Sequence, residues 1–142
     1  MIKILLCCGG GFSSSVIAQR MQKEIERIGK QDEYSMVFYP FTSAVHDNKI
    51  EEYDAVICCP HLKMAVRRAV DEHPDFQTPI YLLPPRIYGN MQIEEILMDV
   101  NDVINIFKVT KQNPVHFPGE ENLLRIQRNV AFRHEYPNKE II

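Results

Sequence analysis

Apolar and polar residues follow two different spacings near the start of the chain. An apolar run, IKILLC at positions 2–7, is interrupted only by Lys3, as expected for a strand that is covered on both faces. From Ser13 onward, apolar residues recur at helical spacing and charged residues fill the opposite face. Gly29 is placed to end that helix. The pattern therefore predicts a buried strand followed by an amphipathic helix.

Three further units repeat this order of strand and helix. Predicted strands cover residues 34–39, 55–59 and 80–83, and a proline follows each of them. Predicted helices cover residues 44–53, 62–70 and 93–107, and the segment PPRIYGN at 84–90 reads as a loop. Because strands that alternate with helices form parallel sheets, we expect an α/β fold: a four-stranded parallel sheet with helices on both faces, in a three-layer sandwich.

The pattern changes after Lys108. Residues 109–142 contain three prolines and no strand pattern, and apolar spacing predicts one amphipathic helix from about Glu121 to Phe132. We interpret residues 1–108 as one domain and residues 109–142 as a C-terminal extension. The sequence leaves open whether this extension docks on the body or remains partly mobile.

Composition and charge narrow the class of protein. A chain of 142 residues, 45% of them hydrophobic, is long enough for one good core. The formal charge of −3 and the lack of a basic cluster larger than Arg67–Arg68 argue against a nucleic-acid partner. No apolar run approaches the roughly 20 residues of a membrane span, and no signal peptide is apparent. We therefore expect a cytoplasmic protein.

The first predicted strand ends in a loop with the sequence CCGGGFSSS, which suggests phosphate chemistry. Glycines can turn their amide groups inward around an anion, and the start of the following helix adds partial positive charge. A thiol in this setting gains thiolate character, so Cys8 is the candidate nucleophile, attacking phosphorus without a metal or cofactor. The predicted phosphate-binding residues are Gly9, Gly10, Gly11, Phe12, Ser13, Ser14 and Ser15.

The other cysteines are assigned structural roles. Cysteines that are adjacent in the sequence are poorly placed to form a disulfide framework or to supply the spaced ligands of a zinc site, so we expect reduced thiols. Side chains alternate along a strand, which predicts that Cys7 faces away from Cys8. Cys58 and Cys59 fill an apolar strand, where core packing is the default.

Three more residues follow strands at the same predicted edge as the loop. His61 comes after the third strand, and Arg86 and Tyr88 come after the fourth. Each is a possible contact for phosphate or for a partner, or a plain surface residue. The residues alone also leave open a binding module in which the loop cradles a nucleotide or flavin and the cysteine is inert.

Two segments resemble a known family. The loop from Cys8 to Ser15, opening a helix, and RIYGNM at 86–91 are similar to the enzyme IIB component of the lactose/cellobiose family of the phosphoenolpyruvate-dependent sugar phosphotransferase system. The resemblance covers about residues 1–108 and implies a flavodoxin-like or phosphatase-like sandwich. It also implies a phosphotransferase in which Cys8 receives phosphate from a IIA phosphohistidine. Cys8 would pass it to a sugar, such as cellobiose, lactose or another β-glucoside or disaccharide, on the membrane component IIC.

The sequence departs from this family at Cys7, an extra thiol, at Phe12, where methionine is common, and in the length of the tail. A rival interpretation is a low-molecular-weight tyrosine phosphatase, which shares the geometry. Its motif, C-x5-R-[ST], would place an arginine where this chain has Ser14, and no Asp-Pro dipeptide supplies a general acid. The absence of these groups favours a carrier over a hydrolase.

Overall fold

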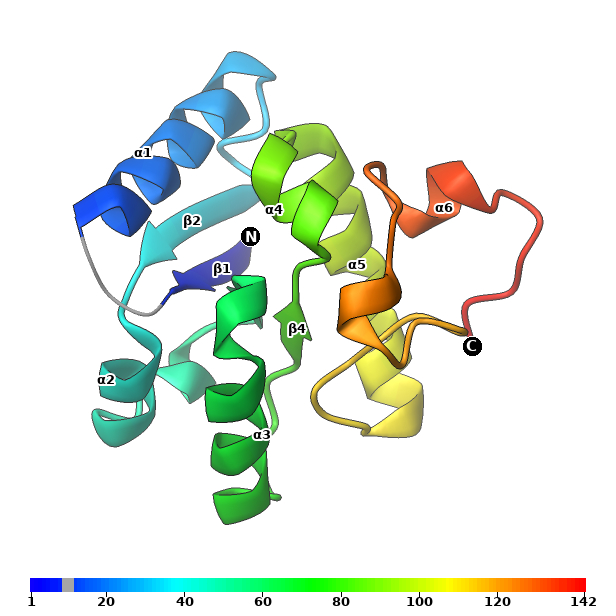
Figure 1. Cartoon of the computed structure of the whole chain (residues 1–142). Helices are drawn as coiled ribbons and strands as arrows, with labels where there is room; N and C mark the ends of the chain where they lie inside the picture. Colours follow the sequence, from blue (N-terminus) through cyan, green and yellow to red (C-terminus); the bar gives the residue numbers. More distant parts are fainter. Residues whose placement is uncertain (9–11) are drawn as a thin grey trace.

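The structure, a computed structural model, describes residues 1–8 and 12–142, and the side chains of these residues apart from 12–14. Strands and helices alternate along residues 1–110, and the tail beyond them contains little regular structure (Figure 1). The elements are β1 Ile2–Cys7, α1 Phe12–Arg27, β2 Tyr34–Phe38, α2 Phe41–His46, β3 Ala55–Cys58, α3 Lys63–Glu72, β4 Ile80–Leu82, α4 Pro85–Asn90, α5 Ile93–Thr110 and α6 Phe132–Glu135, with 3-10 turns at Ile50–Glu52, Pro60–Leu62 and Leu123–Arg125.

The four strands form one parallel sheet in the order β2-β1-β3-β4. Leu5 of the central strand β1 is in register with Val37 of β2 and with Val56 of β3. Because β1 is covered on both faces, Ile4, Leu5, Leu6 and Cys7 are all fully buried. The predicted fold class is confirmed.

Two apolar layers pack on the two faces of the sheet. On one face α1 and α5 cover alternate strand residues such as Ile4, Leu6 and Ile57. On the other face α2 and α3 cover Leu5 and Val56. The sheet is therefore the middle layer of a three-layer sandwich, and its carboxyl edge is where β1 leads to Cys8. Within the described residues, no helix combines the length and the apolar character that crossing a bilayer requires.

Two predicted segments on the body differ from the structure. The segment 44–53 is not one helix: α2 starts earlier, directly after Pro40, and the chain turns at Asn48, which has a φ of 56°, before the 3-10 turn Ile50–Glu52. The segment PPRIYGN is not a loop but the short helix α4. Pro85 occupies its first turn, where the missing N–H costs no hydrogen bond, and Met91 ends it in the left-handed conformation.

The helix predicted from Glu121 to Phe132 does not form. The chain instead makes the 3-10 turn Leu123–Arg125 and, after an irregular stretch, the short helix α6. Leu124, expected on the buried face of a helix, is 73% exposed, whereas Arg128 is buried. The chain around Arg128 is irregular, and the guanidinium group of Arg128 holds it in place through hydrogen bonds to Asp99, Tyr81 and Glu120.

The extension docks on the body, on the side of α5 and β4 (Figure 1). Phe117 and Phe132 stack with ring centroids 4.7 Å apart and join the core that α1 and α5 cover. The buried Arg128 donates hydrogen bonds to Asp99 of α5, at 2.8 Å, and to the Tyr81 hydroxyl of β4, at 2.7 Å. Of the two alternatives, the structure shows the docked one.

Groups from outside the sheet bind both of its edge strands. The tail lies along β4, and the side-chain amide of Gln22 in α1 lies against β2. At the β4 edge, the Ile80 N–H donates to the side-chain oxygen of Asn113 at 2.8 Å, and the Val115 N–H donates to the Ile80 carbonyl at 2.8 Å. At the β2 edge, the Met36 N–H donates to the side-chain oxygen of Gln22 at 2.8 Å. These groups take the place of a further strand.

Candidate functional site

Cys8 lies at the carboxyl edge of the central strand, one residue beyond the end of β1. Its side chain is 3% exposed. The predicted glycine nest, Gly9 to Gly11, lies outside the described residues. The backbone of Phe12, Ser13 and Ser14 forms the first turn of α1, while their side chains lie outside the description; Ser15, on the same helix, is half-buried. The structure thus describes Cys8 and the helix that follows it.

Tyr88 is the side chain that the fold brings to Cys8. Strand β4 ends beside β3, and Pro84 and Pro85 start α4 at once, which turns the chain back over the edge of the sheet. The Tyr88 hydroxyl lies 3.8 Å from the Cys8 sulfur, at hydrogen-bond distance for a thiol. Burial, and next the hydrogen bond with Cys8, raise the pKa of Tyr88 to about 12. At neutral pH the phenol therefore keeps its proton.

His61 lies beside Tyr88 rather than beside Cys8. It belongs to the 3-10 turn that follows β3, and its side chain is exposed. Its ring meets the Tyr88 ring edge-on, with centroids 6.1 Å apart. The prediction that His61 lies at the same edge as Cys8 therefore agrees with the structure, and its contact is with the tyrosine.

Arg86 points away from this group. Two residues along a helix turn a side chain by about 200°, so Arg86 and Tyr88 leave α4 on opposite sides. Arg86 is exposed and lines a hollow of about 710 Å³ against the tail, together with Arg125 and Tyr136. Of the three possible contacts named from the sequence, the structure groups Tyr88 and His61 with Cys8 and separates Arg86 from them.

The prediction that Cys7 and Cys8 face opposite sides is wrong. Both pack in the apolar layer under α2 and α3, and so do Cys58 and Cys59. Alternation applies inside a strand, but Cys8 and Cys59 come just after β1 and β3 end, so their directions follow the turning chain. All four thiols are reduced and buried. Their grouping could have been predicted from the adjacent pairs that end two neighbouring strands.

The Cys58 thiol is held in its protonated form. Burial raises its pKa well above the ordinary value, and a hydrogen bond with Cys7 raises it further. Cys58 pairs in register with Cys7 across β1 and β3. This pair is consistent with the predicted packing role.

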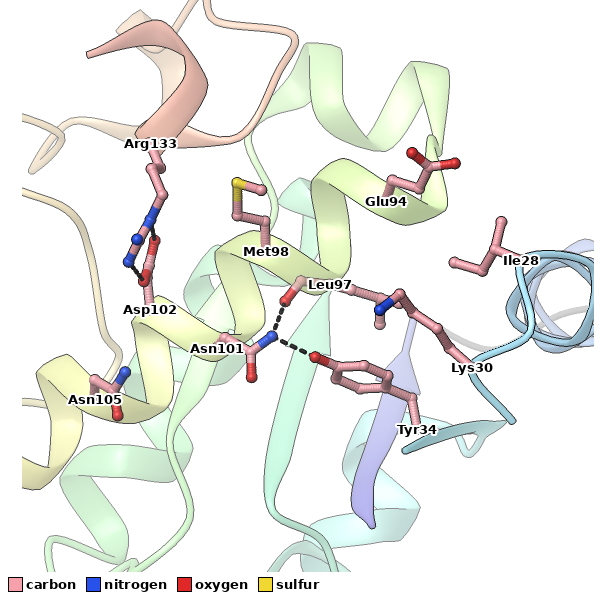
Figure 2. A pocket seen from close by; sticks show the side chains of 10 residues that line it. All are labelled: Ile28, Lys30, Tyr34, Glu94, Leu97, Met98, Asn101, Asp102, Asn105 and Arg133. Atoms are coloured by element: carbon pink, nitrogen blue, oxygen red, sulfur yellow. Dashed lines mark hydrogen bonds and ion pairs between the residues drawn. The ribbon is translucent and has the colours of Figure 1, made fainter. Parts of the chain in front are cut away.

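A separate groove of about 650 Å³ lies near the start of β2, at the opposite end of the strands from Cys8 (Figure 2). Figure 2 shows Asn101 of α5 directed at Tyr34, and Arg133 of α6 paired with Asp102. Cys8, Ser15, His61, Arg86 and Tyr88, the residues of the predicted site whose side chains the structure describes, do not line this groove. It lies between the turn that follows α1, the start of β2, one face of α5 and Arg133 of α6.

Comparison with known families gives a match. Residues 3–99 match the family model described as "PTS system, Lactose/Cellobiose specific IIB subunit". The matched segment includes Cys8, His61, Arg86 and Tyr88 and ends within α5, so the extension lies outside it. A search among curated proteins found no match.

Proposed function

The chain belongs to the lactose/cellobiose-specific IIB family of the sugar phosphotransferase system, and from this premise we propose that Cys8 is the residue that carries the phosphoryl group. Membership of the family implies a phosphotransferase role in sugar transport. The proposal specifies the atom that is phosphorylated: the Cys8 sulfur forms the bond to phosphorus.

The observation that carries the proposal is the contact between Cys8 and Tyr88, 3.8 Å apart at the carboxyl edge of the sheet. In parallel sheets this edge is where ligands bind. Helix α1 begins at Phe12, shortly after Cys8, and the amino end of a helix favours negative charge. A phosphoryl group on Cys8 would thus meet a protonated phenol and backbone N–H groups. The proposed phosphate-binding residues are Gly9, Gly10, Gly11, Phe12, Ser13, Ser14 and Ser15.

The transfer has two steps. In the first, the Cys8 thiolate attacks the phosphorus of a phosphohistidine on IIA; the P–N bond breaks and its electron pair returns to the imidazole. In the second, a sugar hydroxyl attacks the same phosphorus; the P–S bond breaks, the thiolate leaves, and the hydroxyl proton is released to solvent. The Tyr88 hydroxyl donates a hydrogen bond to a phosphoryl oxygen in both steps, and neither step needs a metal or cofactor.

Membership of the family supports the partners and the substrate that we propose. The donor is the IIA component, and the acceptor is a sugar, such as cellobiose, lactose or another β-glucoside or disaccharide, bound by the membrane component IIC. Both exchanges take place in the cytoplasm. Contact with each partner would be brief and would involve the surface around Cys8.

The test is phosphoryl acceptance from phosphorylated IIA, followed by intact-protein and peptide mass spectrometry. Wild-type protein should gain one phosphoryl group, located on Cys8. Cys8→Ser should gain none, because a serine hydroxyl ionises far less than a thiol at neutral pH. Cys7→Ser is the matched control, one residue away and also buried, and should keep most of the acceptance. Equal loss in both variants, or a phosphoryl group on another residue, would overturn the assignment to Cys8.

Weak phosphatase activity is the accompanying expectation. Ser14 stands where a phosphatase loop has its arginine, and Arg86 points away from Cys8. Removing one charge-stabilising donor typically costs about 100-fold or more in rate. Turnover of p-nitrophenyl phosphate should therefore be negligible, and a loaded protein should persist long enough to isolate. Rapid, Cys8-dependent turnover with no transfer from IIA would favour the phosphatase.

A further inference from the structure

Four thiols meet at the carboxyl edge of the sheet, and the proposed function uses one of them. Cys7 and Cys58 are register partners on the adjacent strands β1 and β3. The backbone contact continues to the next residue, because the Cys59 N–H donates to the Cys7 carbonyl at 3.1 Å. Adjacent strands lie about 4.8 Å apart, within the range of Cα separations that a disulfide can bridge. The edge therefore brings Cys7 and Cys58 to bonding range and places Cys8 and Cys59 directly after them on neighbouring strands.

Cys8 and Cys59 are the outer members of this cluster. They are 3% and 2% exposed, whereas Cys7 and Cys58 have no exposed surface. The Cys8 sulfur lies 3.8 Å from the Tyr88 hydroxyl. The pKa of Tyr88, raised mainly by burial, is raised further by the hydrogen bond with Cys8 and by charge on Cys8 and Cys59. All four cysteines belong to one packed cluster on the same face of the sheet, so the two outer thiols lie in the same apolar layer.

We propose that this edge is a site of reversible oxidation, in which a hydroperoxide oxidises Cys8 and Cys59 then closes a disulfide with it. The Cys8 thiolate attacks the terminal oxygen of the hydroperoxide; the O–O bond breaks, the alcohol or water leaves, and Cys8 becomes a sulfenic acid. The Cys59 thiolate attacks the Cys8 sulfur, the S–O bond breaks, and water leaves. Two thiols are oxidised, and one peroxide bond is reduced.

The other pairings are less favourable. Consecutive Cα atoms are about 3.8 Å apart, below the separations of ordinary disulfides, so a Cys7–Cys8 bond would be strained. Cys7 and Cys58 are hydrogen-bonded to each other, but both are fully enclosed, away from a dissolved oxidant. The protonated Cys58 thiol is also a poor attacking group. Cys59 is thus the partner that the geometry favours.

The disulfide would protect the candidate nucleophile. A sulfenic acid without a neighbouring thiol is oxidised further to sulfinic acid, which is irreversible for most proteins. A disulfide is restored by thiol exchange. While the bond exists, the Cys8 sulfur cannot accept a phosphoryl group, so oxidation would switch the protein off without destroying it.

The experiment treats the full-length reduced protein with hydrogen peroxide, blocks remaining thiols with N-ethylmaleimide and digests with trypsin. Cleavage after Lys3, Arg20, Lys49 and Lys63 places Cys7 and Cys8 on peptide 4–20, and Cys58 and Cys59 on peptide 50–63. We expect one cross-link between these peptides, lost on adding dithiothreitol. Tandem mass spectrometry of the wild-type cross-link should locate the bond between Cys8 and Cys59, which avoids reliance on any variant.

Matched variants separate the outer pair from the inner pair. The cross-link should disappear in Cys59→Ala and in Cys8→Ala, and should remain in Cys7→Ala and in Cys58→Ala. In Cys59→Ala, dimedone should label Cys8, and sulfinic acid should accumulate there. Absence of the cross-link in wild-type protein, a bond to Cys7 or Cys58, or persistence of the cross-link in Cys59→Ala would each overturn the proposal. These readouts do not involve phosphoryl transfer, so they are independent of the proposed function.

Discussion

At the scale of single residues, Tyr88 supplies the hydrogen-bond donor that lies beside the Cys8 sulfur. Its phenol is half-buried between α4 and the end of β1, and its pKa of about 12, raised first by burial, keeps it protonated at neutral pH. A protonated phenol beside a sulfur is a hydrogen-bond donor for anions and cannot act as a base. The residue therefore suits the binding of a charged phosphoryl group.

We predict that Tyr88→Phe slows phosphoryl transfer from IIA to Cys8 by roughly 10- to 100-fold. A hydrogen bond to a charged group is worth about 1.5–3 kcal/mol, and the phenylalanine ring keeps the packing while removing the donor. Rapid-quench kinetics would measure the rate. Arg86→Gln, on the opposite side of α4, is the control and should leave the rate within about twofold, as for a surface site. An equal loss in the two variants would contradict the role of Tyr88.

The raised pKa of Tyr88 also predicts a dependence of stability on pH. The folded-state value of about 12 lies above the ordinary value of 10.0, so the folded protein holds this proton more tightly than the unfolded chain does. The resulting stabilisation is fully present below pH 10 and is lost as the pH rises toward 12.

The measurement is a difference absorbance titration of phenolate between wild-type protein and Tyr88→Phe. The difference should have its midpoint near pH 12, while the fold persists by circular dichroism. Wild-type unfolding free energy should also fall more steeply than that of Tyr88→Phe above pH 10. A midpoint near pH 10 would show that Tyr88 is solvated and distant from Cys8.

At the scale of elements, Arg128 ties the tail to β4 and α5. Its guanidinium donates to Asp99 and to the Tyr81 hydroxyl, and Glu120 in the tail accepts at 2.7 Å. Burial raises the pKa of the Asp99 carboxyl, and Arg128 opposes this rise. The carboxylate can remain charged inside the protein because the tail supplies its counter-charge.

We predict that Arg128→Met lowers the free energy of unfolding by about 3–5 kcal/mol, because it leaves Asp99 buried without its partner. Urea unfolding followed by circular dichroism would measure the change. Arg125→Met, an exposed arginine three residues earlier, is the matched control and should change stability by less than about 0.5 kcal/mol. Similar small effects in both would mean that Asp99 is not held by Arg128.

The elements show which features apolar spacing can predict. The strands and the helices α1, α3 and α5 each contribute apolar residues to the two layers of the core, so their spacing revealed them. Helix α4 has 6 residues, begins at Pro85 directly after Pro84, and lacks the length for a detectable period. In the tail, Leu123 and Leu124 suggested a helix, but the hydrogen bonds of Arg128 fix a different backbone, and a polar network leaves no apolar pattern.

For the candidate site, the sequence predicted the position of Cys8 but not the side chains that surround it. A strand that ends in Cys8 before a helix places the thiol at the ligand-binding edge, whichever details follow. The approach of Tyr88, and the separation of Arg86 from it, depend on the helical turn of α4, which the sequence did not reveal. The shared direction of Cys7 and Cys8 depends on how the chain turns after β1, and strand alternation does not cover that turn.

At the scale of the whole molecule, we propose that residues 1–108 and the extension 109–142 unfold as one cooperative unit. Val115, Phe117 and Phe132 belong to the same core as α1 and α5. A chain ending at Lys111 keeps α5 complete with its left-handed cap but loses these three side chains. We predict that its unfolding free energy falls by more than about 4 kcal/mol, since losing one buried phenylalanine alone typically costs 3–5 kcal/mol.

Denaturant unfolding of the chain ending at Lys111 and of the full chain would test this. The full chain should show a single transition by circular dichroism and by tyrosine fluorescence. An unchanged midpoint in the shortened chain would show that the tail is thermodynamically separate.

The edges of the sheet affect the tendency of the protein to aggregate at high concentration. An open strand edge is a template for adding strands from other molecules, the route to amyloid-like growth. In this protein, an incoming strand at β4 would have to displace Asn113 and Val115 from Ile80, and one at β2 would have to displace Gln22 from Met36. Each addition would break a native hydrogen bond before making its own, and the tail that completes the core thus also opposes aggregation through β4.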